Sequence, residues 1–526
     1  MSDLGKRIEQ LPPEKRALLE LLMQRKGLSR SPVGSIPRVP ERDSYPLSFA
    51  QQRLWFMDQM EPGSPFYNEP LLAIRIRGPL DSEVLVRTFD EIVRRHESLR
   101  TTFANVDGKP VQRISPPAPA PVTAVDLRGL PAGQREVKLR ELAQEEAGRP
   151  FDLSAGPLLR VTIVRLGGED HTVLIEMHHI ITDGWSNRIL LREMMQLYDA
   201  ASKGRPNPLP GLPIRYVDFA VWQNQWLKGK VLEELTAYWK RQLGGRLPVL
   251  QLPTDFPRPA VQRYIGRLET RILDRGLSEK VKQLCRGEDC TLFMTLFAAF
   301  LALLYRYTRQ EDLVIGCPVA NRNRVETEGV IGFFVNTLVL RVDVSGNPRF
   351  TELMRRVKKV AVDAYAHEDL PFEKMVEILQ PERDLSRQAL FQVLFVLHNY
   401  PGGPGDVQGL GQDLTLTRIE VDGGESKMDF AMAITDLEEE GIKAQINYST
   451  DLFKTQTVRR MLRQYESLLR SVTANPETCL SAIRISSEED EGGRPADLPG
   501  GRGDIARRLK STTRKPVIIA PPGEES

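Results

Sequence analysis

The sequence of 526 residues has little of what marks several common protein classes. Its four cysteines form no CxxC pattern, which argues against a disulfide framework and fits a reducing cytoplasm, so we interpret them as packing residues. The 72 basic and 70 acidic residues nearly cancel, which gives no reason to expect nucleic acid or a membrane surface as a partner. No signal peptide and no apolar run of membrane-spanning length is present, so we expect a soluble, cytoplasmic protein.

Histidine is scarce as well, yet two of the six histidines, His178 and His179, are adjacent. Imidazole titrates near neutral pH, so a positioned histidine can accept a proton from a nucleophile or hydrogen-bond a developing charge. A zinc site would need a third ligand, and the other histidines form no recognisable ligand pair, so we expect no metal. These other histidines are His96, His171, His367 and His398.

The histidine pair stands between a predicted strand and a predicted helix. Residues 172–177 are mostly β-branched or aliphatic and contain no breaker, which predicts a strand buried on most of its surface. Because neighbouring strand residues point to opposite faces, only one imidazole can share the environment of Met177, and the other must serve the reverse side. Residues 187–198 carry apolar side chains at helical spacing, with Ser186 as the predicted N-cap.

Asp183 and Gly184 complete this segment. Asp183 could orient a histidine, bind a metal, or pair with a distant arginine to hold the loop. Gly184 would allow the backbone to approach a substrate closely. The plain alternative is a pair of core histidines held by the backbone, and the company of Asp183 and Gly184 favours a functional site over it.

The length and a hydrophobic content of 41% predict more than one core. Residues 1–40 read as a helix, at 4–27, on a linker, and a Pro/Gly-rich stretch at 203–213 ends a first lobe that starts at residue 41. Within residues 214–485 the pattern predicts, among other elements, strands at 312–319 and 414–421 and a helix at 350–365. These residues repeat the order of elements of the first lobe, which predicts two similar α/β lobes. The composition of residues 486–526 predicts a disordered tail.

Seven segments in order resemble the motifs of nonribosomal peptide synthetase condensation domains, which belong to the chloramphenicol acetyltransferase-like superfamily. Residues 178–184 are similar to the HHxxxDG signature of that family. Residues 45–56 contain Ser-Phe-Ala-Gln-Gln-Arg-Leu-Trp-Phe, which resembles the first motif closely. The remaining segments that resemble family motifs are residues 95–103, 216–223, 331–337, 367–373 and 388–395.

This resemblance implies two acetyltransferase-like lobes in a V, with the motif strand at their junction and a tunnel between them. The implied reaction is amide formation between a donor acyl or peptidyl thioester and an aminoacyl acceptor, both held on phosphopantetheine arms of peptidyl carrier proteins. The domain itself would bind no cofactor, and would act as a monomer or as part of a larger synthetase. The residues of these motifs resemble those of the subtype that joins an L-configured donor to an L-configured acceptor.

The resemblance also implies roles for single residues. We expect His179 to face the tunnel, as a proton acceptor or as a hydrogen-bond donor to the tetrahedral intermediate, and His178 to face the supporting side. Asp183 is expected to pair with Arg322, or failing that with Arg324, in support of the motif. Gly184 is expected on the acceptor side of the tunnel, and the other residues expected to line it are Trp185, Ser186 and Asn336.

Two other functions are compatible with the same fold. A freestanding acyltransferase would take a soluble thioester such as acyl-CoA together with a small amine or alcohol. A non-catalytic recruitment module would present a surface to another enzyme, and the intact motif argues against this alternative. The identity of donor and acceptor is not encoded in any pattern, because tunnel walls come from scattered residues.

Overall fold

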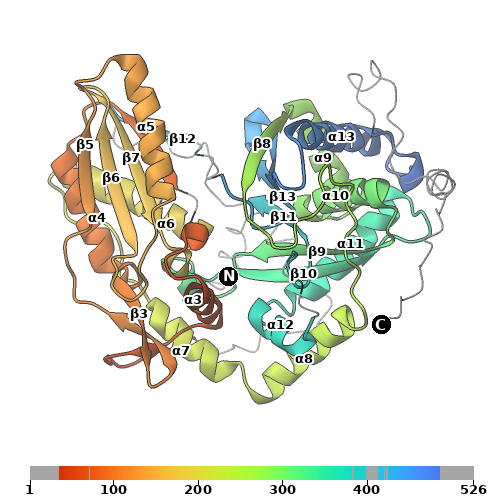
Figure 1. The fold of residues 1–526 in the computed structure, drawn as a ribbon, viewed down its shortest axis with the longest axis horizontal. Helices are drawn as coiled ribbons and strands as arrows, with labels where there is room; N and C mark the ends of the chain where they lie inside the picture. The colour runs from red at the N-terminus through yellow and green to blue at the C-terminus, as the bar shows by residue number, and fades with distance from the viewer. Residues whose placement is uncertain are drawn as a thin grey trace, which may run out of the picture.

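The computed structural model describes residues 35–69, 71–381, 384, 386–398, 413–419, 421 and 424–485. These residues form two lobes, each built on its own sheet, that splay apart as the arms of a V (Figure 1). The helix expected at 4–27 and the tail expected after 485 lie outside the described residues. The domain boundaries proposed from the sequence remain a prediction.

The first lobe contains a five-stranded sheet in the order β12-β2-β7-β6-β5, so the strand that leads into the histidine motif is central. Helices α4 and α6 pack on one face of this sheet and α5 packs on the other. The strands are β2 (Leu72–Arg77), β5 (Val122–Asp126), β6 (Leu159–Arg165), β7 (Asp170–Met177) and β12 (Thr415–Ile419), and the helices are α4 (Ser82–Arg95), α5 (Ala132–Ala147) and α6 (Gly184–Ser202).

Burial on both faces explains the apolar composition of β7. Val173 and Ile175 join the core beneath α4 and α6, whereas Leu174 joins the smaller core beneath α5. All three side chains are fully buried, as expected from the sequence for a strand covered on both faces. The motif that follows β7 therefore starts from a rigid central strand.

The second lobe contains a six-stranded sheet in the order β10-β9-β11-β13-β14-β8. Its central helix, α10 (Leu292–Thr308), is buried along most of its length, which accounts for the long apolar run in its sequence. The other elements are β8 (Gly266–Leu273), β9 (Asp312–Val319), β10 (Asn336–Asp343), β11 (Val393–His398), β13 (Phe430–Asp436), β14 (Ile442–Ser449), α9 (Arg275–Gly287), α11 (Phe350–Tyr365) and α13 (Thr455–Ala474).

Among the described helices, no single helix is long and apolar enough to cross a bilayer, and α9 and α10 reach that length and composition only as a sharply bent pair.

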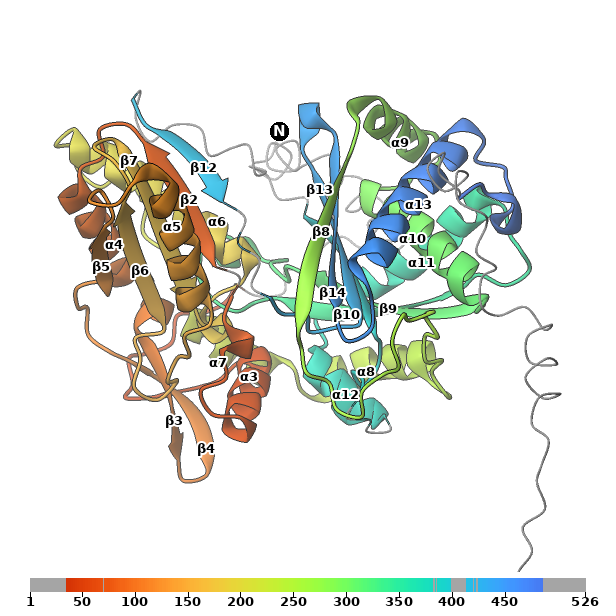
Figure 2. The same ribbon diagram turned by 45° about the horizontal axis from the view of Figure 1, so that its top comes forward.

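Several smaller elements join the lobes at the closed end of the V (Figure 2). Helix α3 of the first lobe contacts α12, which packs on α8 in the second. Helix α7 contacts the short strand β1 of a three-stranded sheet. These elements are β1 (Tyr45–Pro46), α3 (Phe49–Met60), β3 (Thr101–Val106), β4 (Lys109–Ile114), α7 (Tyr216–Trp226), α8 (Gly229–Leu243) and α12 (Phe372–Leu379), and the short 3-10 helices are η1 (Pro65–Tyr67), η2 (Glu97–Arg100), η3 (His179–Ile181), η4 (Val325–Thr327), η5 (Glu438–Glu440) and η6 (Leu480–Ala482).

One strand lies in the lobe opposite to the expected one. The sequence pattern placed residues 414–421 in the second lobe, but β12 pairs antiparallel with β2 and extends the sheet of the first lobe. The approach is close at Gly78, where a Cβ atom would lie 2.2 Å from the carbonyl oxygen of Asp413. Alternation of side chains identifies a strand but not the edge with which it pairs, so the sequence pattern could not reveal this exchange.

Candidate active site

The two motif histidines follow the end of β7 and diverge because the backbone leaves the strand there. The N–H of His178 donates to the carbonyl oxygen of Leu158 at 3.0 Å, and His179 opens the 3-10 helix η3. Nδ1 of His178 accepts the N–H of Ile180 at 3.1 Å and so caps η3. The two rings were expected to diverge through strand alternation, but the turn into η3 separates them.

His178 is a buried, neutral support of the motif. Its ring is 2% exposed and meets the ring of Phe151 edge to face. Burial, followed by the charges of His179 and Lys427, lowers the pKa of His178 to about 3, so this imidazole stays uncharged near neutral pH. The supporting role expected for His178 stays a prediction.

His179 is the more exposed of the pair, with 23% of its side chain accessible. Its Nδ1 lies 2.8 Å from the carbonyl oxygen of Thr182, an acceptor that assigns the ring proton to Nδ1. Its ring packs against Phe333, with 4.7 Å between the centroids. In the neutral form, Nε2 is therefore the ring nitrogen with a lone pair to offer a substrate.

Glu69 adds a negative charge beside His179. Its Oε2 lies 2.9 Å from Nδ1 but makes no aligned hydrogen bond, because the N–H points to Thr182. Burial alone would lower the pKa of His179, but the charge of Glu69, the close contact of its carboxylate with the ring and the bond to Thr182 outweigh burial and raise that pKa above its ordinary value. Glu69 was missed from the sequence, because a single glutamate in a turn far from the motif carries no pattern.

Asp183 sits at the start of α6 and holds the second lobe. Its Oδ1 accepts the N–H of Ser186 at 2.8 Å, and its Oδ2 accepts the N–H of Phe334 at 2.9 Å. Nη2 of Arg322 lies 3.1 Å from Oδ1, so the ion pair expected from the sequence is present. Both partners are buried, and Arg322 also donates from Nη1 to the carbonyl oxygen of Val330 at 2.7 Å.

Ser186 is part of the same network, not the N-cap predicted for α6. Asp183 is the N-cap, and the helix starts at Gly184. The hydroxyl of Ser186 lies 2.8 Å from Oδ1 of Asp183 and accepts from Nη2 of Arg322 at 2.9 Å and from the N–H of Gly332 at 3.1 Å. A Cβ atom at Gly332 would lie 2.0 Å from the ring of Tyr216, so only glycine fits there.

The side chains of three other residues expected at the site make contacts within the protein. Arg324 does not contact Asp183 and instead lies 4.2 Å above the ring of Trp222. Nε1 of Trp185 donates to the carbonyl oxygen of Glu328 at 3.0 Å. The buried Asn336 donates from Nδ2 to the carbonyl oxygens of Glu368 and Leu370, at 2.7 and 2.8 Å.

Ser186 and Asn336 therefore support the motif and the loop before α12 with their polar atoms, and the tunnel-lining role expected for them stays a prediction. Gly184 is partly exposed and begins a regular helix. Its φ is not among the positive values, so a left-handed turn is not the reason for this glycine.

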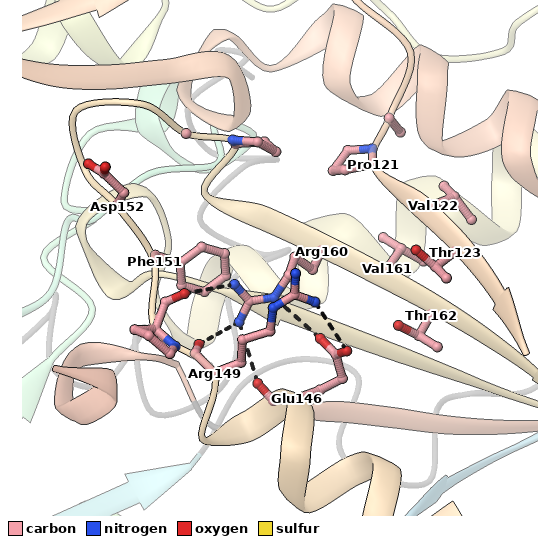
Figure 3. A pocket seen from close by; sticks show the side chains of 14 residues that line it. Pro121, Val122, Thr123, Glu146, Arg149, Phe151, Asp152, Arg160, Val161 and Thr162 are labelled. Carbon is pink, nitrogen blue, oxygen red and sulfur yellow. Dashed lines mark hydrogen bonds and ion pairs between the residues drawn. The ribbon is translucent and has the colours of Figure 1, made fainter. Parts of the chain in front are cut away.

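A cavity of about 410 Å³ lies beside the motif in the first lobe (Figure 3). It is lined by residues from β5, β6 and the end of α5, and the guanidinium of Arg160 lies 3.7 Å above the ring of Phe151 in its wall. Arg160 donates from Nη2 to the carbonyl oxygen of Arg149 at 2.6 Å and pairs with Glu146, so its charge supports the C-terminal end of α5. Phe151, which also contacts His178, separates the cavity from the histidines.

The described residues include no group of three or more His, Cys, Asp or Glu side chains placed to hold a metal ion. The arrangement at His179 offers an imidazole whose neutral form has a fixed tautomer, a nearby carboxylate and a rigid turn. Such a group can accept a proton or hydrogen-bond a developing charge.

A family model described as the condensation domain matches residues 41–492. The chain belongs to the condensation domain family. This condensation domain is 43% identical over 473 residues to a linear gramicidin synthase protein of Brevibacillus parabrevis, covering 90% of this chain and 6% of that protein. The chain thus spans a small part of the synthetase it resembles.

Solved structures share the fold of this condensation domain. The X-domain in its complex with OxyB from teicoplanin biosynthesis has a TM-score of 0.75 and 25% identity, covering 86% of this chain and 99% of that chain. The first condensation domain of the calcium-dependent antibiotic synthetase, in complex with a substrate analogue, has a TM-score of 0.71 and 20% identity, covering 84% and 99%. These likenesses agree with the two acetyltransferase-like lobes expected from the sequence.

Proposed function

We propose that this condensation domain catalyses amide formation between a donor acyl or peptidyl thioester and an aminoacyl thioester, each carried on a peptidyl carrier protein. The observation that carries the proposal is His179, the more exposed imidazole of an intact motif, whose Nδ1 is held by Thr182 so that Nε2 is offered to a substrate. Family membership supports the reaction class.

The proposed step conserves atoms and charge. The amine nitrogen of the acceptor forms a bond to the donor carbonyl carbon, the carbon–sulfur bond breaks, and the proton lost by the amine ends on the departing thiol. Positioning two substrates at one centre can contribute about 7–11 kcal/mol to lowering the barrier. A well-placed histidine adds about 10²–10⁴-fold, either by taking the amine proton or by hydrogen-bonding the tetrahedral intermediate.

The substrates are proposed to arrive on phosphopantetheine arms, so this group belongs to the carrier proteins and not to the domain. Both carrier proteins are partners in this proposal. The residues of the motifs support an L-configured donor and an L-configured acceptor. The freestanding protein and the domain of a larger synthetase are both compatible with this chemistry.

A recruitment module is the second candidate, because this chain resembles an X-domain solved in a complex with another protein, OxyB. In that case the site would bind a partner protein and form no amide. The same experiment separates the two candidates.

The test is intact-protein mass spectrometry of both carriers after they are loaded with L-amino acids and mixed with the domain. We expect the donor group to appear on the acceptor carrier, and His179→Ala to lower the rate by about 10²–10⁴-fold. His367→Ala is the matched control, because Nδ1 of this partly buried histidine also lies against a carbonyl, that of Asp363, at 2.7 Å, and His367 belongs to the second lobe.

Absence of product with every loaded pair, beside a folded protein, would contradict the proposal. Transfer from acyl-CoA but not from carriers would identify an acyltransferase that uses soluble thioesters. Loss of activity in His178→Ala with near-normal turnover in His179→Ala would reverse the roles of the two histidines.

A further inference from the structure

We propose that Glu69 is a positioning residue of this condensation site, whose carboxylate balances the positive charge that His179 gains when its Nε2 takes a proton. The inference rests on the proposed function, because it concerns the proton-accepting form of His179. Glu69 acts through Nδ1 of His179 and touches no substrate atom.

Glu69 is anchored to both ends of the motif. Its N–H donates to the carbonyl oxygen of Met177, the last residue of β7, at 2.9 Å. Its Oε1 accepts from Nδ2 of Asn187, in the first turn of α6, at 3.3 Å. The carboxylate therefore keeps its place relative to His179, and 10% of the Glu69 side chain is exposed.

The two oxygen atoms near Nδ1 of His179 have different effects on the ring. The Thr182 carbonyl, at 2.8 Å, takes the N–H and fixes the tautomer, but it carries no net charge. Oε2 of Glu69, at 2.9 Å, has no aligned hydrogen bond to satisfy it and supplies the charge. An opposite charge within about 4–6 Å favours the protonated form of an imidazole. Glu69 thus makes His179 a stronger proton acceptor.

Other titratable groups around this pair do not replace Glu69. Burial raises the pKa of Glu176 to about 9, and burial also lowers the pKa of His178 to about 3 and of His398 to about 4, so near neutral pH these three groups are uncharged. Of the charged groups, Lys427 interacts with both Glu69 and His179, and Glu425 and Arg53 interact in turn with Lys427.

Lys427 opposes the effect of Glu69 on His179. Its ammonium lies 5.0 Å from the ring of Phe66 and 5.3 Å from that of Tyr67, so this second-lobe cation sits over η1, directly before Glu69. Its charge lowers the pKa of His179, whereas that of Glu69 raises it. Removing Glu69 would remove the carboxylate that opposes the effect of Lys427 on His179.

The first test is Glu69→Gln, which keeps the shape and removes the charge. We expect kcat for amide formation to fall by about tenfold or more, part of the about 10²–10⁴-fold that a positioned base contributes, while the KM for the acceptor carrier changes little. Because the pKa of His179 falls without the carboxylate, the acidic limb of the pH–rate profile moves to lower pH. Glu69→Asp retains the charge. It should keep part of the wild-type rate, and the acidic limb of its pH–rate profile should lie closer to that of the wild type.

Glu61→Gln is the control, because it makes the same charge change at an exposed glutamate at the end of α3. It should leave the rate and the profile unchanged. A Glu69→Gln protein that is folded, as judged by its melting temperature, and has wild-type kcat and pH profile would overturn the proposal.

The second test does not use activity. With six histidines in the chain, NMR of protein with ¹³C- and ¹⁵N-labelled histidine can follow His179, assigned by the signal that is lost in His179→Gln. We expect the proton on Nδ1 in the neutral form, and a titration midpoint that is lower in Glu69→Gln than in the wild type. If Glu69→Gln does not fold, the wild type alone provides the test. A titration midpoint of wild-type His179 at or below that of a free imidazole then overturns the proposal. A midpoint that is lower in Glu69→Gln than in the wild type, together with a folded wild-type protein that forms no amide, would refute the proposed function and leave the role of Glu69 standing.

Discussion

At the scale of single residues, Asp183 couples the motif to the second lobe and should matter for stability. Its carboxylate is buried against Arg322 and accepts two backbone N–H groups. Removing one partner of a buried ion pair costs about 3–5 kcal/mol, because the other charge stays buried without compensation. We therefore expect Asp183→Ala to lower the melting temperature as well as activity, and Asp183→Ala with Arg322→Met to lose less than the sum of the single changes.

Asp126→Ala is the matched control for this prediction, because Asp126 pairs with Arg128 on the surface at 2.7 Å. Solvent screens such a pair, so the melting temperature should stay nearly unchanged. Unchanged stability of Asp183→Ala together with lost activity would instead make Asp183 a participant in the chemistry.

The residues of the motif could be predicted, but the residues that tune it could not. The pairing of Asp183 with Arg322 followed from the family resemblance, and the structure contains it. Arg324, the second candidate for this pairing, instead has its guanidinium over the ring of Trp222. Glu69 reaches His179 only through the folded turn after η1, and nothing in its local sequence marks that contact.

At the scale of elements, Gly184 tests whether the first turn of α6 borders the acceptor path. Because Gly184 has helical geometry, Gly184→Ala should be tolerated and can stabilise the fold by about 0.4–1 kcal/mol. Gly184→Trp should block entry of the acceptor, giving a stable protein that binds the donor carrier and forms no amide. Melting curves, carrier binding and amide formation of both variants give the measurement, and an equal loss of stability in both would contradict the prediction.

Helices and strands whose apolar residues recur at regular spacing were predicted well. The strand at 312–319 and the helix at 350–365 have the bounds that the sequence pattern indicated. The hairpin of β3 and β4 was missed, because its strands are short and most of their residues are only partly buried or exposed. The predicted start of α6 was too late in the sequence. Asp183 and Ser186 are both good N-cap residues, and the fold uses Asp183.

At the scale of the whole molecule, β12 ties the lobes together and should be protected from exchange. Residues 415–419 pair with β2 along their full length, so we expect their amides to exchange slowly in hydrogen–deuterium exchange followed by mass spectrometry. Exchange of these residues as fast as in the unfolded chain would show that β12 does not stay on β2 in solution. The strand was predicted, but its lobe was not, because pairing across more than 300 residues leaves no local signal.

The network around Asp183 also determines how the two arms can move. Asp183 starts a helix of the first lobe, and the same carboxylate accepts the N–H of Phe334 and contacts Arg322 from the second lobe. Any rotation of one lobe against the other that preserves these bonds must have its axis close to Asp183. Displacement grows with distance from that axis, so a rotation that moves the outer ends of the lobes moves His179, four residues from the pivot, much less. Such a rotation would change the opening between the arms and leave the motif histidine nearly in place, as a point beside a fulcrum stays nearly in place when a lever turns.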